Sequence, residues 1–63
     1  MKVKYFVTAT ENTKLLKFYF AKHEKNEAIA CLKNLSLRFK DAELYSVDSE
    51  DDEIVYRLTE KYI

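Results

Sequence analysis

The spacing of apolar residues changes abruptly near His23, and this change restricts the chain to a mixed fold of strands and helix. Before that point apolar and polar positions alternate, which is the period of a strand with one buried face. After it, apolar residues recur every three or four positions, which is the period of an amphipathic helix. The alternation returns after residue 41. The predicted order is two strands, one helix and two strands.

The first pair of strands is predicted at residues 2–10 and 14–22, with Glu11-Asn12-Thr13 as the turn between them. The chain contains neither Gly nor Pro, so other residues have to make its turns. The natural candidates are Asn12, Asn34, Asp41, Asp48 and Ser49, because Asn and Asp adopt a left-handed backbone more readily than most residues do. The two strands are therefore expected to form a hairpin.

The second pair of strands is predicted at residues 42–47 and 53–59. The acidic stretch 48–52 joins them and favours a second hairpin. The last residues, 60–63, are expected either to extend the final strand or to fray.

The helix is predicted between the two hairpins, starting at His23 or Asn26 and ending near Lys40. Asn26 has the better capping side chain, whereas His23 gives the longer helix. Acidic residues near the start and basic residues near the end suit the helix dipole. The buried stripe of this helix is expected to comprise Ala28, Cys31, Leu32, Leu35 and Phe39.

One helix can cover only one face of a four-stranded sheet. The predicted fold class is therefore α+β, a ββαββ chain with a four-stranded antiparallel sheet of two hairpins and one helix packed on one face. The face under the helix is expected to hold Val3, Tyr5, Val7, Leu16, Phe18, Phe20, Leu44, Ile54, Tyr56 and Leu58. The other face is expected to hold Phe6, Leu15, Tyr19, Tyr45, Val47 and Val55, with Lys4, Lys17 and Arg57 among them.

Residues 1–63 suffice for a single small domain. Cys31 is the only cysteine, so no internal disulfide can form, and a lone thiol suits a reducing compartment. No apolar run approaches the roughly 20 residues that span a bilayer, and the N-terminus lacks the pattern of a signal peptide. The cytoplasm is the expected compartment, and no contact with a membrane is expected.

The helix-free face gives the main functional prediction. Six sizeable apolar or aromatic residues on one side of a sheet exceed the scattered apolar exposure of a typical monomer. A chain of this size buries only about 60% of its unfolded surface, so it gains from a partner. We therefore expect a non-enzymatic interaction module that forms a homodimer or binds another protein. Its expected contact residues are Lys4, Phe6, Lys17, Tyr19, Tyr45, Val55 and Arg57.

Single-stranded nucleic acid is the alternative ligand of the same face. Lys4 and Lys17 alternate with Phe6 and Tyr19 on neighbouring strands, which combines phosphate-binding charge with stacking surfaces. Arg57 adds a further cation. Against this function, the net charge of the chain is zero and glycine-containing RNA-binding motifs are absent.

Charge is divided along the chain although it sums to zero. Residues 1–40 hold nine Lys and Arg against three Glu, whereas residues 41–63 hold two basic residues against eight acidic ones. Such a division favours association through opposite charges, including antiparallel pairing of two copies.

Catalytic and cofactor motifs are not found. Phosphate loops, dinucleotide fingerprints and nucleophile elbows all require glycine, which the chain lacks. His23 and Cys31, on one predicted helix, would lie about 12 Å apart along its axis, too far for a nucleophile and its base. Asp48, Glu50 and Asp52 alternate like calcium-loop ligands, but the required glycine and final glutamate are missing, so a solvated acidic turn is predicted. The sequence thus predicts no enzyme, cofactor, metal site or small-molecule substrate.

Overall fold

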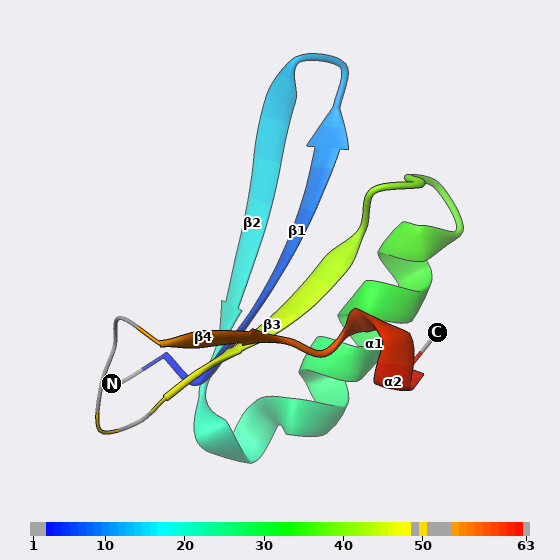
Figure 1. Cartoon of the computed structure of the whole chain (residues 1–63). Coiled ribbons are helices and arrows are strands. Elements are labelled where there is room, and N and C mark those ends of the chain that lie inside the picture. Colours follow the sequence, from blue (N-terminus) through cyan, green and yellow to red (C-terminus); the bar gives the residue numbers. More distant parts are fainter. Residues whose placement is uncertain (1–2, 49, 51–53, 63) are drawn as a thin grey trace.

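The computed structural model describes residues 3–48, 50 and 54–62, and its elements follow the expected ββαββ order (Figure 1). The strands and helices are β1 Tyr5–Glu11, β2 Lys14–Phe20, the 3-10 helix Lys22–Glu24, α1 Lys25–Ser36, β3 Glu43–Val47, β4 Val55–Arg57 and α2 Thr59–Tyr62. The predicted first three strands thus agree with the structure apart from residues at their ends.

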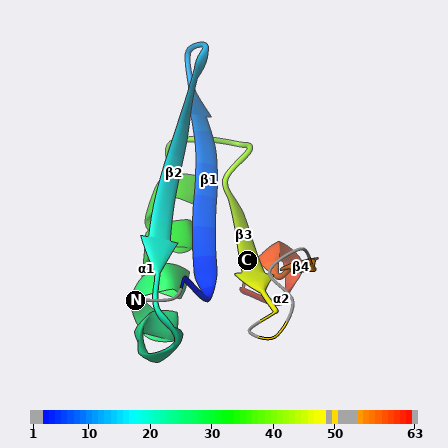
Figure 2. The same cartoon turned by 90° about the vertical axis from the view of Figure 1, so that its left-hand side faces the viewer.

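The four strands form one antiparallel sheet in the order β2-β1-β3-β4. The two hairpins, β1–β2 and β3–β4, meet along β1 and β3, so β2 and β4 are the two edges of the sheet. Helix α1 packs on one face (Figure 2). The predicted fold class, a four-stranded antiparallel sheet of two hairpins with one main helix against it, is confirmed.

The first hairpin closes through a two-residue turn, with Glu11 opposite Lys14 across the end of the ladder. Asn12 has a φ of 59° and is the only described residue with a positive φ. That value lies in the left-handed region, where Asn is the residue best tolerated after Gly. In a chain without Gly, Asn12 is therefore what allows the tight connection.

Helix α1 begins differently from either predicted start. A 3-10 turn, Lys22–Glu24, precedes it, and the Glu24 carboxylate closes this turn by accepting a hydrogen bond from the Ala21 N–H at 2.8 Å. Both Asn26 and His23 are therefore wrong as the N-cap. The helix ends at Ser36, earlier than the predicted Lys40, yet the Phe39 N–H still donates to the Leu35 carbonyl at 2.8 Å.

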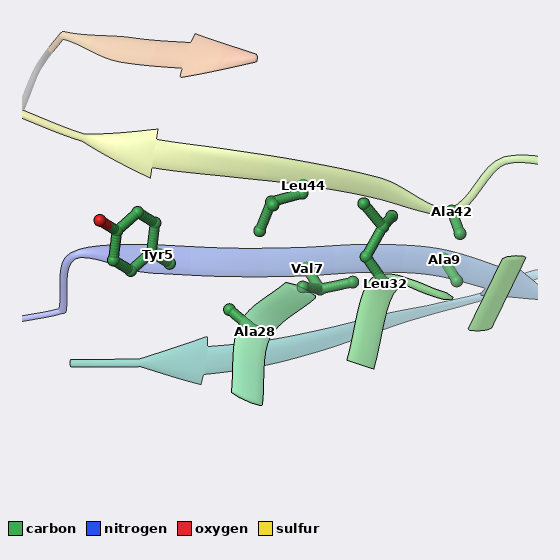
Figure 3. Close-up of a cluster of buried hydrophobic side chains, with 7 residues drawn as sticks. All are labelled: Tyr5, Val7, Ala9, Ala28, Leu32, Ala42 and Leu44. Carbon is green, nitrogen blue, oxygen red and sulfur yellow. The ribbon is translucent and has the colours of Figure 1, made fainter. Parts of the chain in front are cut away.

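The core lies between α1 and the two central strands. Leu32 and Ala28 of the helix meet Val7 of β1 and Leu44 of β3, and all four are almost completely buried (Figure 3). Tyr5, Ala9 and Ala42 complete the cluster. The small side chains of Ala28, Ala9 and Ala42 permit close approach of helix and sheet, so a single short helix can seal this core.

The predicted covered face is wrong at both edges of the sheet. Phe18 of β2 is 40% exposed, and Ile54 and Tyr56 beside or within β4 are also exposed, although each was assigned to the face under the helix. The reason is position: α1 lies over the middle of the sheet, while Phe18 lies on the edge strand β2, and the other edge strand, β4, extends beyond the helix (Figure 1). Val3 is exposed as well.

The C-terminal residues also differ from the prediction, because they form a helix instead of extending the last strand. Strand β4 stops at Arg57, and α2 starts at Thr59. The buried Thr59 hydroxyl accepts a hydrogen bond from the Leu44 N–H at 2.9 Å and donates one to the Glu43 carboxylate at 2.7 Å. Leu58 and Tyr62 then pack against the core cluster. Thr59 therefore ends strand β4 by forming side-chain hydrogen bonds with two residues of β3.

The acidic connection between β3 and β4 is only partly described. The Glu50 N–H donates to the Asp48 carboxylate at 2.8 Å, and the Asp48 N–H donates to the Ile54 carbonyl at 2.9 Å. Residues 49 and 51–53, which include most of the predicted solvated acidic turn, lie outside the described residues.

Candidate interaction surface

The register of the sheet aligns aromatic residues in a row across its helix-free face. Phe6 lies opposite Tyr19 on β2 and opposite Tyr45 on β3. The Phe6 and Tyr45 rings stack, with centroids 4.9 Å apart and planes inclined by 20°, and the Phe6 and Tyr19 centroids are 6.4 Å apart. We refer to Tyr19, Phe6 and Tyr45 as the aromatic row. Pairs at these separations stabilise a sheet face beyond the area that they bury.

A lysine lies over this row. The Lys17 ammonium is 5.0 Å from the centroid of Phe6 and 5.8 Å from that of Tyr19. A cation over an aromatic face is attracted to its electron density, typically by about 0.5–1 kcal/mol at exposed positions. The aliphatic part of Lys17 is thereby held over the sheet, and its charge remains at the surface.

Exposure is unequal along the face. Tyr19 is 58% exposed and Leu15, on the same strand, is 63% exposed. Phe6 and Tyr45 are less exposed, because their neighbours cover part of each ring. Val47 is likewise partly covered. The predicted set of six uncovered apolar residues therefore lies on this face, but its exposed apolar area is concentrated on β2 and on Val55 of β4.

Arg57 is held in an ion-pair network at the other end of the aromatic row. Its guanidinium donates to both carboxylate oxygens of Glu43, at 2.6 and 3.0 Å, and to Glu60. The hydrogen bonds from Arg57 and then from Thr59 keep the pKa of Glu43 below its ordinary value, and those two glutamates raise the pKa of Arg57. The Arg57 charge is thus balanced within the chain and is poorly placed to bind phosphate.

Six of the seven residues predicted as contacts lie on this face by the register of the strands, and the seventh, Lys4, lies just before β1. Lys4 accepts a hydrogen bond on its carbonyl from the Val47 N–H at 2.7 Å, and Val47 lies opposite Val55 on β4. A row of paired residues crosses the four strands through Tyr19, Phe6, Tyr45 and Arg57, and Lys17 lies beside it. The structure therefore brings Phe6, Tyr19, Tyr45 and Lys17 into contact and places Val55 and Arg57 on the same face.

Sequence reasoning missed Glu43 as a member of this surface. Glu43 lies opposite Thr8 on β1, two residues along β3 from Tyr45 of the aromatic row, and it carries the network that neutralises Arg57. The alternation of β3 alone places Glu43 on the same side as Tyr45, so the signal was present. Its partner on β4, 14 residues away, depends on strand order, which the sequence does not specify.

No metal-binding cluster is found among the residues that the structure describes. In that part of the chain no group of three His, Cys, Asp or Glu side chains is placed to hold a metal ion. His23 is exposed in the 3-10 turn, whereas Cys31 is partly buried, which raises the pKa of its thiol. Helices within the described ranges are too short or too polar to cross a bilayer.

Comparison with known proteins adds no further identification. No protein-family model, curated protein or solved structure matches this chain. The geometry of the helix-free face is therefore the basis for a functional proposal.

Proposed function

We propose that this chain is a non-enzymatic protein-interaction module whose contact surface is the helix-free face of its sheet. The observation that carries the proposal is the aromatic row, with exposed Tyr19 at one end and the Lys17 ammonium above it. Aromatic residues supply much of the binding energy in protein interfaces because they bury a large rigid area at low entropic cost.

The size of the domain supports the same proposal. Among the residues that the structure describes, the largest fully buried side chains are those of Leu32, Leu44 and Val7. A core this small contributes little stability, so covering the helix-free face with a partner would stabilise the fold appreciably. The partner is a second copy of this chain or another protein, and the compartment is the cytoplasm, where the lone Cys31 thiol would remain reduced.

Single-stranded nucleic acid is the second candidate ligand, and one observation favours it. Lys17 and the aromatic row present a cation beside stacking surfaces, the combination that binds backbone phosphate and bases. Three cations, Lys4, Lys17 and Arg57, are expected to bind phosphate, but the Arg57 guanidinium is already occupied by ion pairs within the chain. A protein partner therefore accounts better for the whole face.

Sedimentation velocity of a fluorescently labelled chain, alone and in an extract of the source cells, tests the proposal. The chain should sediment as a complex, and Tyr19→Ser should return a large part of it to the monomer. Leu37→Ser is the matched control, because Leu37 is a leucine 85% exposed just beyond α1 and away from the sheet face. Equal loss of the complex in both variants, or no complex at all, would contradict the proposal.

A titration of a fluorescent oligonucleotide at low salt separates the second candidate. Electrostatic binding is strongest under those conditions. Binding that Tyr19→Ser and Lys17→Gln both weaken would favour nucleic acid over a protein partner, and absence of binding would eliminate it.

A further inference from the structure

Strand β2 is an open edge, and its pairing pattern shows which backbone groups are free to bond. The Leu44 N–H donates to Thr59 and the Leu44 carbonyl accepts from Leu58, so Leu44 directs its backbone away from Val7, its partner on β1. The Thr10 N–H donates to Asp41, so even-numbered residues of β1 direct their backbone towards β3. Because the direction alternates in an antiparallel ladder, odd-numbered β1 residues bond to even-numbered β2 residues. The N–H and C=O groups of Leu15, Lys17 and Tyr19 therefore point outward.

Both sides of this edge also carry exposed apolar groups. Leu15 and Tyr19 are exposed on the helix-free face, and Phe18 is exposed on the opposite face, where α1 does not reach. A further strand placed beside β2 would lie about 4.8 Å away and would shield all three side chains. Long uncovered edges are normally blocked in monomers, so β2 has the form of a pairing site.

The charges along β2 specify what kind of strand would fit. Lys14 and Lys17 are exposed, and within the described ranges neither forms an ion pair. Strand β2 contains no acidic residue. At the opposite edge Arg57 is neutralised by Glu43 and Glu60, so the cation on β4 is balanced by carboxylates of the chain, unlike the two on β2.

We propose that the β2 edge binds an extended, acidic segment of another protein as a fifth strand. This inference rests on the proposed function and names the partner for that module. Lys14 and Lys17 are three positions apart and therefore lie on opposite faces of the strand, with Leu15 and Leu16 between them. The matching partner carries two acidic residues three positions apart, with apolar residues between and after them.

A second copy of this chain fits the edge less well. Pairing β2 with itself would add two Lys14 and two Lys17 side chains to one junction, and neither copy of β2 contributes an acidic residue there. Like charges placed opposite each other destabilise a sheet. Charge complementarity thus favours a different, acidic partner over self-pairing.

The test uses the full chain and synthetic eight-residue peptides, observed by amide hydrogen exchange in NMR spectra. One peptide has two glutamates three positions apart among valine and threonine; a second has the same composition with the glutamates two apart, on a single face. Two more replace the glutamates by glutamine or lysine. The first peptide should slow exchange at the Leu15, Lys17 and Tyr19 amides, by about tenfold when about 90% of the chain is bound.

Moving or neutralising one charge should weaken binding by about two- to fivefold, the usual value of one exposed ion pair. This applies to the peptide with glutamates two apart, to Lys14→Gln and to Lys17→Gln. Lys33→Gln, an exposed position on α1, is the matched control and should bind like the unaltered chain. Added salt should weaken the first peptide most.

Three results would overturn the inference. Peptide binding that leaves exchange at Leu15, Lys17 and Tyr19 unchanged, or no binding at millimolar concentration, would show that the lysines only protect the edge. Equal affinity for all four peptides would show that binding does not depend on the number or spacing of acidic residues. Slower exchange on concentrating the chain alone would assign the edge to a second copy. If edge binding is seen while Tyr19→Ser leaves the sedimenting complex intact, the proposed use of the face fails and the edge inference stands.

Discussion

Replacing Thr59 by valine should destabilise the fold by breaking the junction between β3 and α2. Valine keeps the shape of threonine but removes the hydroxyl that accepts the Leu44 N–H and donates to Glu43. Thr59 is 8% exposed and Leu44 is almost fully buried, so water has little access to the N–H that would lose its partner.

The expected cost of Thr59→Val is about 1–3 kcal/mol, the usual penalty for a buried polar group without a hydrogen bond. The added methyl group offsets a part of this cost, so a net loss of about 1–2 kcal/mol is expected. For a domain of this size, each kcal/mol corresponds to a fall in Tm of about 4–8 °C.

Urea unfolding followed by far-UV circular dichroism measures this change, with Thr59→Ser as the matched control. Serine keeps the hydroxyl and loses one methyl group, which should cost less than about 1 kcal/mol. The valine variant should therefore be the less stable of the two. A valine variant as stable as the unaltered chain, or more stable than the serine variant, would refute this role for the hydroxyl.

Further predictions concern the turn, the core, the ion pair and the thiol. Asn12→Val should cost about 1–2 kcal/mol in urea unfolding because φ is positive at that position, while Asn12→Gly should be tolerated; equal stability would contradict it. Leu32→Ala should cost about 2–5 kcal/mol and leave the chain largely unfolded, as judged by the dispersion of its NMR spectrum. The pKa of Glu43 is lowered in the folded state, so its stabilising contribution is complete above pH 4.5 and is lost as the pH falls through its lower folded value; Glu43→Gln should flatten this part of the pH–stability curve. Burial raises the pKa of Cys31, so a thiol reagent should modify it more slowly in the native chain than in guanidinium chloride, and equal rates would place the thiol in solvent.

The first hairpin and the core of the helix could be predicted because their signals are local. Alternation places Tyr5, Val7 and Ala9 on one side of β1, and the helical stripe places Ala28 and Leu32 against them. Asn12 could be assigned to the turn because a chain without glycine has few residues suited to a left-handed backbone. These features depend on neighbours within a few positions.

The errors involve residues whose environment is set by distant parts of the chain. Phe18 and Tyr56 follow the alternation of a buried face, but α1 lies over the middle of the sheet and does not reach them. Thr59 continues the alternation of β4, yet its hydroxyl bonds to Leu44 and starts α2 instead. Neither the position of the helix nor the strand order is encoded in local spacing.

The candidate surface was predicted in membership but not in arrangement. Parity along each strand is enough to place Phe6, Tyr19 and Tyr45 on one face. Their alignment into stacked neighbours requires the register of three strands, and the neutralisation of Arg57 requires the contact between β3 and β4. The structure is therefore needed to show which charges are balanced: within the described residues Arg57 forms ion pairs, whereas Lys17 contacts aromatic rings and forms no ion pair.

A photo-crosslinking comparison tests most directly whether the helix-free face is the contact surface. A photoreactive phenylalanine analogue is placed at Tyr19 on that face or at Leu37 beyond α1, both largely exposed, and the chain is irradiated in its source cells. We predict a discrete cross-linked product from Tyr19 that Tyr45→Ser diminishes, and none from Leu37. Products of equal yield from both positions, or a product from Leu37 alone, would contradict this account.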